Sequence, residues 1–258
     1  MIAVPLALGL VIGALVGLLG GGGSILAVPA LVYLAGQDLR QAVATSLVVV
    51  GITAAVAVVP RLRERQVSWR IGLLFGAAGA ATAFAGAAVN RLLPDAVTLA
   101  LFAALMVAAG FRMLQEQPAI GTACAIDGGG VNWRRCLPRT IAGGLVVGFL
   151  TGLLGVGGGF LIIPVLVLAL GLPMATAVGT SLLVVAINSA AGFAAHVGQA
   201  TLDVPVTLAF TAAAVVSAFA AGRLGTRTDT DRLRRWFAWL VLTVAALIGV
   251  RLLVDVLT

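Results

Sequence analysis

Two long stretches without a charged side chain constrain this chain more than any other feature. No Asp, Glu, Lys or Arg occurs from Met1 to Gln37 or from Thr140 to Leu202. Both stretches exceed the ~20 apolar residues that a helix needs to cross a bilayer. Both are also too long and too continuously apolar for a barrel strand of ~10 residues. Only 10% of the chain is charged, against roughly 25% in soluble domains. The sequence therefore predicts an all-α polytopic membrane protein, with the lipid bilayer as its first partner.

A glycine-rich motif occurs once in each stretch, and the two copies are in register. Gly17–Pro29 reads GLLGGGGSILAVP and Gly152–Pro164 reads GLLGVGGGFLIIP, 135 residues apart, with 8 of 13 positions identical. At the same offset, Ala42–Ile52 and Ala177–Ile187 are identical at 8 of 11 positions. This repeat predicts two homologous halves in three segments: repeat 1 at 1–114, a connector at 115–138 and repeat 2 at 139–258.

Each half combines one glycine-interrupted stretch with three further apolar spans, which we expect near 40–60, 71–90, 95–113, 175–195, 205–222 and 236–256. If each glycine stretch is a single crossing, the 16 arginines divide 9 to 7 between the two sides. If each is a broken, re-entrant helix, the halves are inverted and the arginines divide 13 to 3. The positive-inside rule favours the second topology. It puts the connector in the cytoplasm and both termini outside.

The net charge of +7 comes from arginines alone, because the chain has no lysine. We interpret these arginines as topology signals and expect no nucleic-acid partner. Cys124 and Cys136, the only cysteines, lie in the connector without a nearby histidine. They are weak candidates for metal ligands, so we expect no metal and no cofactor. We interpret them as thiols of a reducing compartment, with a regulatory disulfide as the alternative.

The glycine clusters are the candidate substrate site. Paired Gly/Pro interruptions at matching positions of two apolar halves mark the substrate site of many transporters. The helix that leaves such a turn begins inside the membrane, and its first N–H groups attract an anion. The alternative is that these glycines only permit close helix packing. The candidate residues are Gly20, Gly21, Gly22, Gly23, Ser24, Gly155, Gly157, Gly158 and Gly159.

Polar side chains at matching repeat positions extend this candidate site. Thr45 and Ser46 correspond to Thr180 and Ser181; their hydroxyls can donate to an anion or bond back to a carbonyl of their own helix. Asn188, whose repeat counterpart is Thr53, either joins two helices or contacts the ligand. His196 is the only histidine. It could carry a coupling proton, or it lies at a helix end at the membrane surface.

The paired G-L-L-G-x-G-G motifs, each followed by a proline, and the A-x-x-T-S segments resemble those of the sulfite exporter TauE/SafE family of bacterial membrane proteins. The resemblance covers nearly the whole chain and departs mildly at Val156 and at the arginine-rich loop after Pro60. It implies a secondary transporter that exports a small sulfur-containing anion, sulfite or an organosulfonate. The substrate and the direction are implied by the resemblance alone.

Two other classes of function are open at this point. A passive anion channel shares every feature above and would differ in flux saturation and voltage dependence. An intramembrane serine hydrolase needs a nucleophile and a base within hydrogen-bond reach. Ser181 and His196 lie 15 residues apart on one predicted helix, about 22 Å at 1.5 Å per residue, and so cannot form this pair. Ser24 with His196 is conceivable, but no sequence feature supports it, and we expect no enzyme. For the oligomeric state, the sequence leaves a monomer and a homodimer open.

Overall fold

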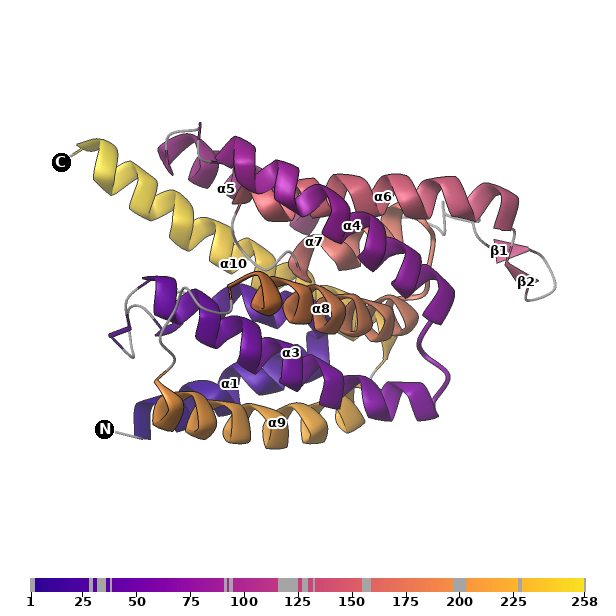
Figure 1. The fold of residues 1–258 in the computed structure, drawn as a ribbon. Coiled ribbons are helices and arrows are strands. Elements are labelled where there is room, and N and C mark those ends of the chain that lie inside the picture. The colour runs from indigo at the N-terminus through magenta and orange to yellow at the C-terminus, as the bar shows by residue number, and fades with distance from the viewer. Residues whose placement is uncertain are drawn as a thin grey trace.

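The protein folds into a bundle of long helices (Figure 1). The computed structural model describes residues 3–27, 30–31, 36–37, 39–90, 92, 95–115, 125–126, 130–131, 133–154, 159–196, 203–226 and 229–257. Repeat 1 contains α1 (Ala3–Leu19), the 3₁₀ segment η1 (Gly20–Leu26), α3 (Leu39–Arg63), α4 (Trp69–Asn90) and α5 (Asp95–Leu114). Two antiparallel two-residue strands lie in the connector, β1 (Ala125–Ile126) and β2 (Gly130–Val131). The second half contains α6 (Trp133–Leu154), which begins within the predicted connector, α7 (Gly159–Pro164), the π-helical segment η2 (Val165–Ala169), α8 (Met174–His196), α9 (Val204–Thr226) and α10 (Thr230–Leu257).

The expected spans are helices, which confirms the all-helical, multi-pass class. Within the described residues, five helical segments are long and apolar enough to cross a membrane: Pro5–Ser24, Ala44–Arg63, Cys136–Leu153, Met174–Ala191 and Val204–Gly225. They form because an apolar segment in lipid must satisfy its backbone hydrogen bonds internally, and a helix does so within itself. Many large apolar side chains are exposed on the outside of the bundle, among them Phe84, Leu208 and Val216. Lipid tails would cover such a surface.

Two helix pairs are joined by the same seam of small residues. Along α1, every fourth residue is a glycine, and a Cβ atom at any of them would overlap α9. Along α6, glycines at the same spacing meet α4 in the same way. The matched sets are Gly9, Gly13 and Gly17 against Phe210, Ala214 and Ala218, and Gly144, Gly148 and Gly152 against Phe75, Gly79 and Ala83. At the 135-residue offset α1 corresponds to α6, and α4 corresponds to α9. These glycines let two backbones approach closely, as small residues do in membrane bundles.

These contacts also fix the direction of each helix. Residue numbers rise together along α1 and α9, and likewise along α6 and α4, so each pair is parallel. The end of α3 lies against the end of α9, where Gly222 faces Ala57 and Gly225 faces Arg61. Helix α3 therefore runs with α1 and α9. Since α1 and α3 point the same way, α3 begins at the end of the bundle at which α1 began.

Helices α4, α6 and α8 run in the opposite direction. In α4, Gly72 faces Leu183 of α8, and Gly76 faces Ile187 one turn further along both helices. Helix α8 is antiparallel to α3, because Ser68 after α3 contacts Thr180 near the start of α8, whereas Gly51 in mid-α3 lies against Ser189 late in α8. Thus α1, α3 and α9 run one way, and α4, α6 and α8 the other. Both chain ends lie at one end of the bundle, and the β1–β2 hairpin lies at the other (Figure 1).

Candidate functional site

The first glycine motif makes a sharp turn at the end of α1. Gly20 has a φ of +68°, a left-handed conformation that glycine adopts without steric cost. The chain then continues as η1, whose Gly21 lies against Gly159 at the start of α7 and against Val185. Val185 is at the middle of α8 (Met174–His196). The two glycine motifs therefore touch, backbone to backbone, beside the centre of a long helix.

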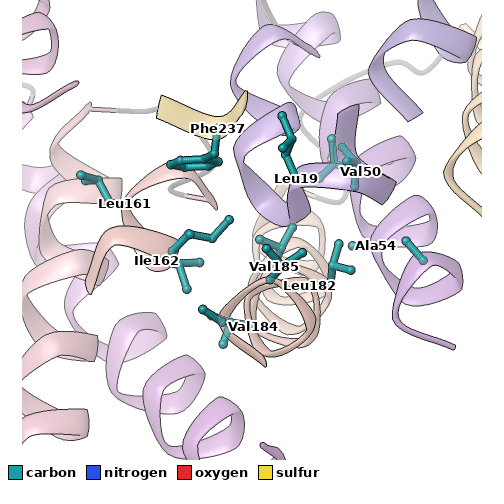
Figure 2. Packing of buried hydrophobic residues seen from close by; sticks show 14 of the residues in the cluster. Leu19, Val50, Ala54, Leu161, Ile162, Leu182, Val184, Val185 and Phe237 are labelled. Atoms are coloured by element: carbon teal, nitrogen blue, oxygen red, sulfur yellow. The ribbon is translucent and has the colours of Figure 1, made fainter. Parts of the chain in front are cut away.

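The space beside the other first-motif glycines is filled by protein. A Cβ atom at Gly22 would overlap the ring of Phe237 from α10, and one at Gly23 would lie 2.5 Å from the backbone nitrogen of Val16. Figure 2 shows Phe237 grouped with Leu19, Ile162 and Val185, which come from α1, α7 and α8. Protein atoms therefore occupy the space beside Gly22 and Gly23, as the close-packing alternative predicts. The anion-binding role of the glycines stays a prediction, and Gly155, Gly157 and Gly158 lie outside the described residues.

Two of the predicted hydroxyl groups bond back to their own chain segments. Ser181 Oγ donates to the carbonyl of Val178 at 2.8 Å and accepts the N–H of Gly21 at 3.4 Å. Ser24 Oγ donates to the carbonyl of Gly21 at 2.6 Å. The bond between Gly21 and Ser181 ties the first glycine turn to α8, whereas the other two bonds lie within η1 and within α8. His196 ends α8, and its side chain is not among those described.

The equivalent threonines of the two repeats have different surroundings. Thr180 Oγ1 accepts the backbone N–H of Ser68 at 3.0 Å, and so holds the α3–α4 loop on α8. Its counterpart Thr45 is fully buried, yet its Oγ1 has no hydrogen-bond partner. Ser46, beside Thr45, is also buried.

Two further unpartnered polar atoms lie at a matched pair of positions. They are Oγ1 of Thr53 on α3 and Oδ1 of Asn188 on α8, and these residues correspond under the 135-residue offset. An unmade hydrogen bond of this kind costs about 1–3 kcal/mol, and the usual reason to retain one is a ligand, a water or an ion. Thr45, Thr53 and Asn188, on the packed helices α3 and α8, are therefore candidates for contact with a polar ligand. Gln37 and Thr207 also carry buried side-chain atoms without a partner.

A buried arginine is the main feature that sequence reasoning missed. The sequence treats Arg61 as one of many topology signals at the end of an apolar span, and predicts that N–H dipoles and hydroxyls alone hold an anion. In the structure Arg61 is fully buried, and it is the one charged side chain buried among the described residues. One guanidinium nitrogen donates to the carbonyls of Gly17 (3.2 Å) and Leu18 (3.1 Å), at the end of α1. One signal in the sequence could have found it. At the 135-residue offset Arg61 corresponds to His196, so both repeats carry a basic residue at this position.

The connector also differs from expectation. Cys136 is disulfide-bonded in the structure, so the interpretation of two free thiols is wrong for this residue. Cys124, the only other cysteine of the chain, lies outside the described residues. Cys136 is buried near the start of α6, where its carbonyl accepts the hydroxyl of Thr140 at 2.9 Å.

Comparison with known proteins agrees with this architecture. The family model described as "Sulfite exporter TauE/SafE" matches residues 5–248. A "Probable membrane transporter protein" of Xylella fastidiosa (strain 9a5c) is 32% identical over 237 residues, covering 91% of this chain and 89% of its own length. The "Probable membrane transporter protein YunE" of Bacillus subtilis (strain 168) is 27% identical over 265 residues, covering 96% of both chains. No solved structure matches the chain.

The helical bundle and these relatives define a multi-pass membrane protein of the transporter class. More specifically, the chain belongs to the sulfite exporter TauE/SafE family, as the resemblance of its paired glycine motifs predicted.

Proposed function

We propose that this chain is a secondary transporter that exports a small sulfur-containing anion, sulfite or an organosulfonate, across the bacterial inner membrane. The family description supports the substrate class and the direction. The observation that carries the proposal is the meeting of the two glycine motifs, Gly21 against Gly159, beside the middle of α8. A substrate site at the interface of two repeats, built from interrupted helices, is the arrangement of many secondary transporters.

The proposal includes an inverted-repeat architecture with a cytoplasmic connector. Helix α1 is antiparallel to its repeat counterpart α6, and the same holds for α3 with α8 and for α4 with α9. The same 135-residue correspondence relates the contact of α1 with α9 to the contact of α6 with α4. Each glycine stretch then enters and leaves at one face, and one repeat can move against the other to alternate access.

The anion would lie close to the glycine motifs, with side chains of α3 and α8 as its polar contacts. Thr45, Thr53 and Asn188 each carry a buried oxygen without a partner, and helices α3 and α8 pack against each other. The hydroxyls of Thr45 and Thr53 can donate to an oxyanion, so a bound anion would supply their missing partners. Oδ1 of Asn188 is an acceptor and would need a donor such as a water molecule. His196 at the end of α8 is the proposed carrier of a coupling proton.

Flux in reconstituted vesicles tests this function. We expect saturable transport of sulfite, measured against sulfate, thiosulfate, sulfoacetate and chloride as competitors. A monovalent sulfonate should inhibit more strongly than sulfate, because the cost of removing water from an anion rises steeply with its charge. Flux that rises linearly with concentration and follows the voltage would instead indicate a passive channel. The absence of flux for every anion of the panel would contradict the proposal.

A further inference from the structure

Arg61 has the hydrogen bonds of a structural residue but lacks a balancing negative charge. Its guanidinium donates to the carbonyls of Gly17 and Leu18 and, at 3.3 Å, to Oε1 of Gln66. All three acceptors are neutral. No carboxylate pairs with Arg61 within the part of the chain that the structure describes, and its buried Nε–H has no partner.

The helix end beside Arg61 compensates only part of this charge. The C-terminal carbonyls of a helix act as roughly half of an elementary negative charge, and α1 ends at Leu19, directly after the two carbonyls that Arg61 contacts. A buried guanidinium carries a full positive charge and cannot be deprotonated in a protein. A net positive charge therefore remains, and burial of an uncompensated charge is strongly unfavourable. Such a site attracts an anion.

Arg61 is also next to the first glycine motif. Leu18, whose carbonyl it holds, is two residues before the left-handed Gly20. The ends of α1, α3 and α9 converge here, since Gly225 of α9 has no side chain and approaches both the guanidinium and Gly17. This is the arginine-rich end of the bundle, which also carries Arg63 and Arg223.

We propose that Arg61 binds the transported oxyanion through its Nε–H, at the end of α1, before the anion reaches the glycine motifs. This inference rests on the proposed transport function and adds a residue and a ligand class to it. A singly charged oxyanion would neutralise the remaining positive charge of the guanidinium and accept the hydrogen bond of its Nε–H. Arg61 would then be a binding residue as well as the group that holds the broken helix.

Binding of sulfite to purified protein tests the proposal. A ligand that binds the folded state raises its melting temperature in proportion to ln(1 + [L]/Kd), so sulfite titration gives a Kd for each variant. Arg61→Gln removes the charge and the Nε–H, whereas Arg61→Lys keeps a charge without the planar fork. Arg63→Gln is the matched control, because Arg63 is two residues away and exposed.

We expect Arg61→Gln to raise the Kd for sulfite at least tenfold and Arg61→Lys to raise it less, while Arg63→Gln binds as the wild type does. A merely structural Arg61 would give a lower melting temperature without sulfite and an unchanged Kd, which would overturn the proposal. If Arg61→Gln does not fold, Arg61→Lys decides, and a wild-type KM for sulfite flux in that variant would also overturn it. If the wild type itself neither binds nor transports any anion, the proposed function fails instead.

Discussion

Replacement of Gly22 by alanine tests whether the first glycine motif is held by close packing. The added Cβ would overlap one ring carbon of Phe237 and lie 3.1 and 3.3 Å from two others. Carbon atoms are at optimal separation at about 3.5–4.0 Å, so the ring must move by more than ~1 Å. Phe237 is fully buried and has little room to do so. Overpacking of this kind costs about 1–3 kcal/mol.

The loss should be visible as a lower melting temperature in detergent. One kcal/mol shifts the midpoint of a chain of 150–250 residues by about 2–4 °C, so we expect Gly22→Ala to melt about 2–12 °C below the wild type. The matched control is Gly76→Ala, because a Cβ at Gly76 finds only ordinary contacts at 3.8 Å. The control should melt at or slightly above the wild-type temperature, since alanine is the better helix former by about 1 kcal/mol.

A second substitution separates packing from anion binding. Phe237→Leu shortens the side chain that faces Gly22. The double variant should therefore be more stable than the sum of the two single changes, by about 0.5–3 kcal/mol. If packing is all that Gly22 provides, sulfite flux recovers along with stability. Recovery of stability without flux would assign Gly22 to the ligand, and strictly additive losses would refute the steric argument.

Two further predictions follow from the site and the topology. Thr45→Val should leave the melting temperature unchanged or raised and should increase the KM for sulfite, because the Thr45 hydroxyl has no partner to lose. Thr180→Val should instead lower stability by about 1–3 kcal/mol, because it leaves the N–H of Ser68 without an acceptor. Wild-type kinetics in Thr45→Val would remove that residue from the site. In a cysteine-free background, single cysteines placed at Arg63 and at Arg234 should label from the same, cytoplasmic side; labelling from opposite sides would contradict the inverted topology.

Much of the helical scaffold follows from the sequence, because one strong effect decides it. A continuous apolar run in lipid has few alternatives to a helix, and the expected spans near 40–60, 175–195 and 205–222 lie within α3, α8 and α9. The α1–α9 and α6–α4 seams were also visible in principle. Glycines recur at every fourth position in both segments and match at the 135-residue offset.

The polar contacts of the site were not predictable, because they depend on what packs against each residue from distant segments. Thr45 and Thr180 are identical repeat positions, yet only Thr180 meets the N–H of a neighbouring loop, that of Ser68. The repeat counterpart of Ser68 is Asp203, whose carboxylate instead accepts the N–H of Val206 at the start of α9. The donor to Thr180 is a backbone N–H, which Asp203 also has, so the difference between the two threonines comes from how the loops pack and not from the residue type. The burial of Arg61 is similarly a product of tertiary packing.

The two halves therefore share a scaffold and differ in the polar groups attached to it. The seam glycines match between the repeats, whereas Thr53 is replaced by Asn188 and Arg61 by His196 at the same 135-residue offset. In an inverted-repeat transporter the two repeats exchange roles between the two access states. Matched seams keep both states well packed, but a permanent cation in one half and a titratable imidazole in the other make the two states unequal in energy. On the proposed topology, Arg61 lies at the cytoplasmic end and His196 at the outer end. An anion that enters from the cytoplasm then meets a fixed positive charge, which stabilises the bound state on that side. This asymmetry changes the rates of the individual steps, whereas the gradients of the anion and of any coupled ion set the net direction of transport.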